Sequence, residues 1–242
     1  MEDLTDKKKF FDINLELRKG EVVGIAALDG QGQTELLQAL AGVRHRAGGK
    51  IYLNGQELNY NRPIKAIKNG IGYVPEDRKN MGLCLSLSVR ENIALSSLKL
   101  RSRMGFVDKP AEDKVVDRMI QVMNIKTPSP AYAVGNLSGG NQQKVSIGKA
   151  LAADPRVILL NEPTRGIDVD AKQEIYKLIR GLANQGVAVL IYSSDMMEII
   201  GLCDRVLTFY EGRLTYEMTG DDINEENIMY GQMNLQPADK NK

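Results

Sequence analysis

The stretch NLSGGNQQKVSIGKAL, Asn136 to Leu151, decides how the rest of this chain is interpreted. Ser138, Gly139 and Gly140 stand where the stretch turns into a helical pattern whose apolar positions include Val145. A serine hydroxyl, glycine N–H groups and the positive end of a helix dipole together form a tip that can bind an anion. The simpler interpretation is a serine that caps an ordinary helix after a loop.

The next segment along the chain is RVILLNEPTRGIDVDAKQEIY, Arg156 to Tyr176. Its apolar run Val157–Leu160 predicts a buried strand, and Asn161 and Glu162 follow that strand directly. Phosphoryl-transfer enzymes hold Mg²⁺ and polarise the attacking water at such a carboxyl end. Asn161 can orient a metal-bound water but brings no charge, whereas Glu162 can act as a general base. An ordinary strand exit with a solvated glutamate is the alternative.

Upstream lies VVGIAALDGQGQTELLQAL, Val22 to Leu40, which predicts a strand, a glycine turn and a helix beginning near Thr34. Glycines let successive N–H groups approach phosphate oxygens, and a threonine hydroxyl at the helix start can ligate Mg²⁺. Against the phosphate-loop pattern G-x-x-x-x-G-K-[ST], Gly32 and Thr34 match, while Ala27 and Gln33 do not. A tight strand-to-helix turn without a ligand is the other interpretation.

Short β-rich runs alternate with helical patterns, which predicts an α/β fold with a mainly parallel sheet. The expected strands are Glu21–Ala26, Lys50–Leu53, Ile71–Val74, Val157–Leu160, Val187–Tyr192, Arg205–Tyr210 and a last one near Arg213–Tyr216. Glu211–Gly212 predicts the tight turn of a hairpin between the last two strands. A helix after Asp168 is indicated by the spacing of Ile175, Leu178, Ile179 and Leu182.

The composition excludes several classes of protein. With 32 Lys+Arg against 31 Asp+Glu in 242 residues, the formal charge is +1, which argues against a broad electrostatic grip on nucleic acid. Cys84 and Cys203 fit no metal or redox spacing, and we expect reduced core thiols. No apolar run approaches the roughly 20 residues of a membrane span. We therefore expect a soluble protein whose contact with a membrane requires a partner.

The string LSGGNQQ followed by VILLNEPTRGIDV resembles the ATP-binding cassettes of ABC transporters, and the resemblance covers nearly the whole chain. GYVPEDRKNMGL, SVRENIAL, KTPSP and VGNLSGGNQQKV further resemble the C-terminal cassette of tandem-cassette sugar importer ATPases of the ribose/galactose/xylose type. The implied fold is a P-loop NTPase-like α/β cassette with a mainly parallel core sheet, an N-terminal antiparallel β region and an inserted helical subdomain. Because the chain has room for one cassette, we interpret it as the C-terminal half of a tandem protein, with a naturally separate cassette as the alternative.

The expected domain division follows from a break in the strand–helix alternation. Residues 1–74 and 155–242 form the nucleotide-binding core, with a disordered tail at 235–242. Residues 75–154 form an inserted helical lobe that carries the signature motif around Ser138.

The resemblance implies roles for individual residues. The P-loop is Ala27–Glu35, and the residues expected to bind the nucleotide are Asp29, Gly30, Gln31, Gly32, Gln33, Thr34 and Glu35, with Ser138, Gly139 and Gly140 as the signature. The metal residues are Thr34, Asn161 and Glu76, and the catalytic ones are Glu162 and Ser194. The D-loop and the coupling segment supply Asp168, Glu76, Asp77 and Arg78.

Three positions depart from the family pattern. Gln33 replaces a lysine that contacts phosphates, Asn161 removes a charge from the metal shell, and Ser194 replaces the switch histidine. We expect this chain's own site to bind nucleotide weakly or moderately and to hydrolyse it poorly. Its complete signature then serves the ATP on the partner's P-loop.

The implied cofactors are ATP and Mg²⁺. The implied partners are an N-terminal cassette, membrane permease subunits and, indirectly, a sugar-binding protein, with the chain peripheral on the cytoplasmic face of the membrane. Alternatives are a regulatory nucleotide-binding module without turnover, a nucleoside importer, and a soluble ABC protein of DNA repair or translation. Phe10 and Phe11 are the early aromatic candidates for stacking on adenine, but strand packing explains them equally well.

Overall fold

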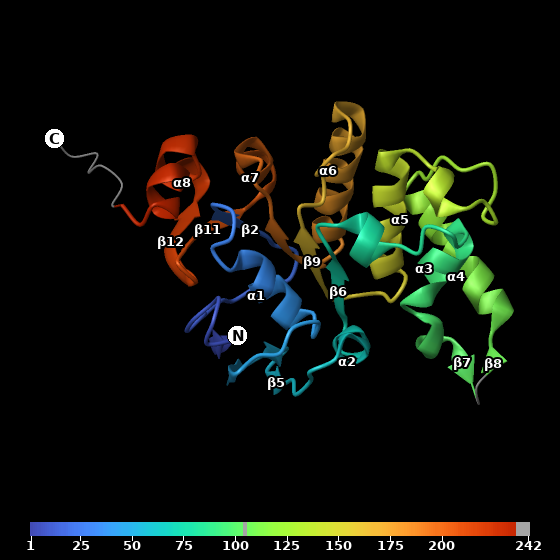
Figure 1. Ribbon diagram of the computed structural model, residues 1–242, viewed down its shortest axis with the longest axis horizontal. Coiled ribbons are helices and arrows are strands. Elements are labelled where there is room, and N and C mark those ends of the chain that lie inside the picture. The colour runs from blue at the N-terminus through green and yellow to red at the C-terminus, as the bar shows by residue number, and fades with distance from the viewer. Residues whose placement is uncertain (104–105, 236–242) are drawn as a thin grey trace.

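A central six-stranded sheet organises the fold of the computed structural model, which describes residues 1–103 and 106–235 (Figure 1). The tail expected to be disordered is 235–242, and of it residues 236–242 lie outside the described part. The strand order is β12-β11-β2-β10-β9-β6, and all neighbours are parallel except the β11–β12 pair. In chain order the strands are β2 Val22–Ala27, β6 Ile71–Val74, β9 Val157–Asn161, β10 Ala188–Tyr192, β11 Arg205–Tyr210 and β12 Arg213–Thr219. The predicted α/β class with a mainly parallel sheet is confirmed.

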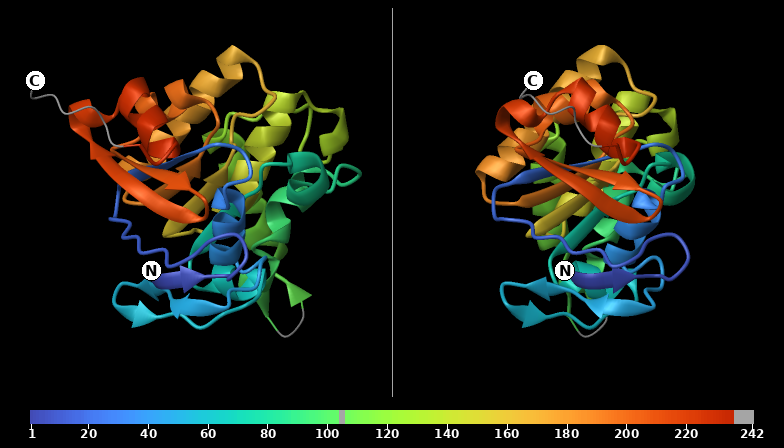
Figure 2. Two further views of the ribbon diagram at one scale, coloured as in Figure 1. Left: turned by 60° about the vertical axis from the view of Figure 1, so that its left-hand side comes forward. Right: turned by 90° about the vertical axis from the view of Figure 1, so that its left-hand side faces the viewer.

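The two faces of the sheet are covered by different parts of the chain. The side chains of β2 alternate between two hydrophobic cores. Val22 and Ala26 belong to the core on one face of the sheet, while Val23 and Ile25 belong to the core on the other face. Helices α5 to α8 cover the first face, and α1 with the N-terminal strands covers the second (Figures 1 and 2). These helices are α1 Gln33–Leu40, α5 Gly139–Leu151, α6 Val169–Asn184, α7 Met196–Leu202 and α8 Glu225–Gln232. Because both faces are buried, the strands are continuous apolar runs, which is why the sequence predicts them well.

The β11–β12 hairpin has the predicted turn. Glu211 and Gly212 both have positive φ, 44° and 79°, as a type I′ turn requires, and Tyr210 pairs with Arg213. The last strand continues to Thr219, beyond the predicted end at Tyr216.

One predicted strand is wrong. Lys50–Leu53 is divided into β3 Gly48–Lys50, which pairs antiparallel with β1 Glu2–Thr5, and β4 Tyr52–Leu53, which pairs antiparallel with β5 Gln56–Glu57. Ile51 between them is buried in the core, so the chain changes partner there. The short helix α2 Pro63–Lys68 follows and leads to β6.

Residues 75–154 are mostly helical. They contain the π turn η1 Arg78–Gly82, helix α3 Val89–Leu95, helix α4 Lys109–Val122 and α5. Ser88 and Glu91 form a reciprocal capping box at the start of α3, which explains the string SVRENIAL. The antiparallel pairing of strands β7 Ser102–Arg103 and β8 Phe106–Val107 was not predicted. Short 3₁₀ turns span Leu98–Leu100, Val134–Asn136 and Gly220–Asp222.

Both cysteines are free, but only part of the expectation holds. Cys203 is half-buried, whereas Cys84 is exposed and is therefore not a core thiol.

Within residues 1–103 and 106–235, no helix combines the length and the apolar character needed to cross a membrane.

Candidate functional site

The turn after β2 exposes the start of α1 in a form that suits an anion. Gly30 and Gly32 have φ of 79° and 113°, and Gly32 precedes α1 without contributing a side-chain cap. A Cβ on Gly32 would lie 2.1 Å from the carbonyl oxygen of Lys9, so only glycine fits there. The first N–H groups of a helix have no intrahelical partner, and here no capping side chain takes them. This turn has the geometry expected of the phosphate cradle that the sequence predicts, and we refer to it below as the cradle.

Gln33 does not extend toward that cradle. Its side chain is 2% exposed, and Nε2 donates a 3.1 Å hydrogen bond to the carbonyl oxygen of Leu28 in the same turn. Gln33 Oε1 is buried and has no hydrogen-bond partner among the described residues. The Gln33 side chain therefore stabilises the turn through this hydrogen bond and supplies no positive charge.

Beside the cradle, the end of β9 meets the start of α1. Asn161 Nδ2 donates to Thr34 Oγ1 over 3.4 Å, which joins residues far apart in sequence as predicted. Asn161 is 1% exposed, and its Oδ1 has no hydrogen-bond partner in the described part of the chain. A buried oxygen without a donor fits a ligand that brings one, such as a metal-bound water.

Glu162 lies at the carboxyl edge of the sheet in a left-handed conformation, with φ of 51°. Its N–H donates to the carbonyl oxygen of Tyr192 over 2.8 Å, and its Oε1 accepts the N–H of Ser194, also over 2.8 Å. Burial raises the pKa of Glu162 above its ordinary value, the contacts with Ser194 oppose that rise, and the charges of Asp29 and Asp195 add to it. A carboxylate with a raised pKa is a stronger base, which suits the predicted role.

A tyrosine that the sequence analysis missed supports the same site. Tyr192 ends β10, and its hydroxyl donates to Asp29 Oδ1 over 3.3 Å. Burial raises the pKa of Tyr192 to about 12, so the hydroxyl stays protonated and holds the P-loop aspartate. Its position at the carboxyl end of a strand beside β2 is a signal that could have identified it.

A second buried carboxyl, on α7, was also missed. Glu198 on α7 is 2% exposed, and its Oε2 accepts the hydroxyl of Thr164 over 3.2 Å. Burial raises the pKa of Glu198 to about 7, although hydrogen bonds from Ser193 and Thr164 act against the rise. This residue connects the loop after β9 to the loop after β10.

The signature segment caps α5. Ser138 Oγ accepts the backbone N–H of Asn141 over 3.4 Å and its side-chain Nδ2 over 3.0 Å. A Cβ on Gly140 would lie 2.8 Å from Cβ of Ala171, so α5 and α6 begin side by side. No hydrogen bond or ion pair of residues 1–103 and 106–235 joins Ser138–Gly140 to the P-loop, and α5 lies toward α3 and α4 in Figure 1.

The Glu76–Arg78 segment is attached to the loop after β9. Glu76 forms an ion pair with Arg165, and Arg78 donates to the carbonyl oxygens of Arg165 at 2.9 Å and Gly166 at 3.3 Å. Asp77 caps η1 by accepting the N–H groups of Lys79 and Asn80. Glu76 is thus directed at a cation of the protein rather than at Thr34 or Asn161.

Asp168 begins α6 as an exposed cap. Its Oδ1 accepts the N–H of Ala171 over 2.8 Å.

The two aromatic residues near the N-terminus lie in different environments. Phe10 is fully buried in the core, while Phe11 is half-buried against Gly212 and Arg213. Phe10 therefore cannot stack on a ligand.

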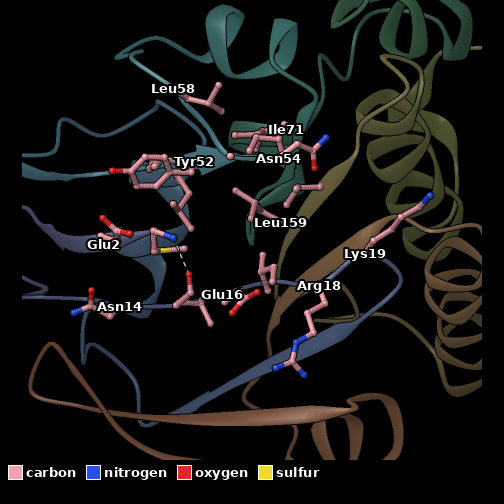
Figure 3. A pocket seen from close by; sticks show the side chains of 18 of the residues that line it. Glu2, Asn14, Glu16, Arg18, Lys19, Tyr52, Asn54, Leu58, Ile71 and Leu159 are labelled. Atoms are coloured by element: carbon pink, nitrogen blue, oxygen red, sulfur yellow. Dashed lines mark hydrogen bonds between the residues drawn. The ribbon is translucent and has the colours of Figure 1, made fainter.

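A large cavity lies elsewhere. It has a volume of about 990 Å³ and lies between the N-terminal strands and the sheet, with Glu2, Tyr52 and Leu159 around it (Figure 3). Its lining includes Ile71 and Val157, the first residues of β6 and β9, whereas the cradle lies at the carboxyl ends of the strands. Ligands of open α/β sheets bind at the carboxyl ends, so this cavity is not the candidate site.

Comparison with known proteins agrees with this geometry. Residues 10–165 match the sequence profile of the family described as ABC transporter. A ribose import ATP-binding protein of Mesorhizobium japonicum is 48% identical over 94% of this chain and 44% of its own length. A xylose import ATP-binding protein of Moorella thermoacetica is 47% identical over 92% of this chain and, again, 44% of its own length. The chain thus spans less than half of either relative.

Solved structures share the fold at lower identity. A nucleotide-free ATP-binding cassette of an ABC transporter superimposes with a TM-score of 0.78 at 18% identity, covering 92% of this chain and 91% of that one. A dimeric cassette bound to ADP and phosphate gives a TM-score of 0.74 at 24% identity, covering 87% of this chain and 90% of that one.

Proposed function

This chain belongs to the ABC transporter family, and we propose that it is one ATP-binding cassette of a pair that couples ATP hydrolysis to import of a monosaccharide through a membrane permease. One observation carries the proposal: Asn161, which directly precedes Glu162, contacts Thr34 beside a helix start whose N–H groups are uncapped. The sugar-import relatives supply the substrate class.

The nucleotide phosphates would be held by backbone N–H groups of Gly30–Glu35. Thr34 and Asn161 would hold Mg²⁺ together with the phosphates, and the buried unpartnered Oδ1 of Asn161 fits such a role. The described residues contain no cluster of three His, Cys, Asp or Glu side chains that could hold a metal alone. When bound, the ion supplies charge stabilisation to the transferring phosphoryl group.

Glu162 would be the base that takes a proton from water. Its Oε1 is held by the Ser194 N–H, and burial keeps its proton affinity high. Three groups that promote turnover are missing from this site: a lysine at position 33, a charged metal ligand at position 161 and a histidine at position 194. The residues present are Gln33, Asn161 and Ser194. Loss of one transition-state contact typically lowers turnover about 10²–10³-fold, so we propose that this site binds ATP and hydrolyses it poorly.

The signature would act on a partner's nucleotide. Ser138 is exposed at the start of α5, whereas Gly140 is buried against Ala171. We propose that the partner is an N-terminal cassette, because each sugar-import relative is more than twice the length that this chain matches. Asp168, exposed at the start of α6 beside Gly140, would lie at the same interface.

The permease would contact a groove between the core and the helical segment. A cavity of about 300 Å³ is lined by Val43 and Ile67 on one side and Met81 and Lys149 on the other. Val43 and Met81 are exposed apolar side chains, and the Glu76–Arg78 segment lies at one end of η1. This arrangement supports the proposed division into a lobe, residues 75–154, and a core, residues 1–74 with 155–242. We further propose that the chain acts at the cytoplasmic face of the membrane through the permease and has no nucleic-acid partner.

Equilibrium dialysis with Mg-ATP tests the proposal. Measurable binding is expected, weakened several-fold by Thr34→Val, because that change removes the hydroxyl but keeps the shape. Thr127→Val, at an exposed hydroxyl outside the site, is the matched control. No binding by the unaltered chain would contradict the proposal. Binding of ATP without any turnover, even with the partner cassette present, would favour a regulatory nucleotide-binding module. Transport assays with nucleosides would distinguish a nucleoside importer from a sugar importer.

A further inference from the structure

A loop of three consecutive lysines, Lys7–Lys9, lies next to the phosphate cradle. The carbonyl oxygen of Lys9 would be 2.1 Å from a Cβ on Gly32 and 2.6 Å from a Cβ on Gly212. Gly32 immediately precedes α1, so the backbone of Lys9 rests against the start of that helix.

The loop is held in place by Asp6. Asp6 Oδ1 accepts the N–H groups of Lys8, Lys9 and Phe10 at 2.9, 2.7 and 3.1 Å, and Oδ2 accepts Arg44 Nε at 2.8 Å. Burial acts to raise the pKa of Asp6, but these hydrogen bonds prevail and lower it to about 2. Phe10 anchors the end of the loop in the core. The lysines are therefore presented on a fixed backbone.

The cradle has no positive side chain of its own. From Ala27 to Leu40 the ionisable residues are Asp29 and Glu35, and Gln33 is turned inward to Leu28. The neighbouring arginines are engaged elsewhere, since Arg44 pairs with Asp6 and Arg213 pairs with Asp12. A polyphosphate bound here would face two carboxylates without a compensating cationic side chain from this segment.

The lysines are free to supply that cation. All three side chains are exposed, and none takes part in an ion pair or a side-chain hydrogen bond within residues 1–103 and 106–235. Beside the turn, at the end of β9, the buried Asn161 Oδ1 also has no hydrogen-bond partner in the described part. These features mark the turn as a site that a ligand completes.

We propose that the Lys7–Lys9 loop, chiefly Lys9, contacts the phosphates of the nucleotide bound at the start of α1 and replaces the lysine that the P-loop lacks. The ligand class is a nucleoside di- or triphosphate. The inference rests on the proposed function, because it assumes that the cradle binds a nucleotide.

Nucleotide affinity measured by equilibrium dialysis tests the role of the loop. Lys9→Ala is expected to weaken binding of ATP and ADP roughly tenfold, the size of one charge-assisted contact, and to leave adenosine binding unchanged. Lys9→Arg should retain most of the affinity. Lys114→Ala, an exposed lysine on α4, is the matched control and should change nothing. Thermal melting of each variant checks that the fold is intact.

A double-mutant cycle with Gln33→Lys makes the test sharper. With a lysine restored in the P-loop, Lys9→Ala should cost clearly less than in the original background, because the two cations serve the same phosphates. An equal loss in both backgrounds, or unchanged ATP affinity in Lys9→Ala, would overturn the inference while leaving the proposed function standing. A loss confined to Lys7→Ala or Lys8→Ala would overturn the assignment to Lys9. No ATP binding by the unaltered chain would overturn both.

Discussion

The backbone N–H of Ser194 donates a 2.8 Å hydrogen bond to Oε1 of Glu162. The loop after β10 therefore holds the candidate base through the main chain, whatever side chain occupies position 194. The serine hydroxyl adds to the same effect, since it also lowers the pKa of Glu162. The site can thus keep its base oriented although it lacks an imidazole.

The proton affinity of Glu162 is predicted to respond to two variants in opposite directions. Ser194→Ala removes a hydroxyl that stabilises the carboxylate, so the pKa should rise further. Asp29→Asn removes a nearby negative charge, so the pKa should fall. The carbon-13 shift of the Glu162 carboxyl, assigned with Glu162→Gln and followed against pH, measures both. Shifts of the same sign would contradict this account.

Stability is predicted to depend on pH through Glu198. Its folded pKa of about 7 lies above the ordinary value of 4.5, so between these values the folded chain keeps a proton that the unfolded chain has lost. The free energy of unfolding should fall as pH rises through this window, by at most about 1.4 kcal/mol per pH unit from this group. Urea unfolding at pH 5.5 and 8 measures the loss. Glu198→Gln should be less pH-dependent, and an equal dependence in both chains would exclude Glu198 as the cause.

The two glycines of the phosphate cradle are predicted to differ in tolerance. Gly32→Ala forces a Cβ against the carbonyl oxygen of Lys9 at a φ of 113°, whereas a Cβ on Gly30 meets nothing within 4 Å. Gly30→Ala should therefore cost only the backbone strain of about 1–2 kcal/mol, and Gly32→Ala clearly more. Urea unfolding of the two variants side by side provides the comparison. Equal costs would show that Lys9 does not pack against Gly32.

The loop after Glu162 is predicted to depend on Arg78. Arg78→Ala removes the donors to the carbonyl oxygens of Arg165 and Gly166, each worth about 1 kcal/mol. Amide hydrogen exchange in residues 164–168 should become about tenfold faster. The exposed neighbour Lys79 offers a matched control, because Lys79→Ala removes no such contact. Unchanged exchange in Arg78→Ala would contradict the account.

Local patterns were sufficient to predict most of the sheet and its carboxyl-edge residues. The strands around Val157–Asn161 and Ile71–Val74 are buried on both faces, and their apolar runs end where their polar residues begin. The same patterns could not show that the chain changes partner at Ile51, because that break depends on β1 and β5 pairing from outside the segment.

Contacts between distant segments explain what the sequence did not show. Tyr192 meets Asp29, Glu198 meets Thr164 and Arg165 meets Glu76, and in each case the two residues belong to segments that follow or end different strands. Only the folded sheet brings these segments to one edge. The role of Glu76 as a metal residue stays a prediction, while its observed partner is Arg165.

Steady-state phosphate release from Mg-ATP, measured for this chain beside Glu162→Gln, tests the central claim most directly. We predict equal background rates, because Gln33, Asn161 and Ser194 leave the chain's own site without the charges that drive turnover. Release well above that of the variant would contradict the proposed division of labour, in which this chain binds nucleotide and its signature serves the partner's ATP.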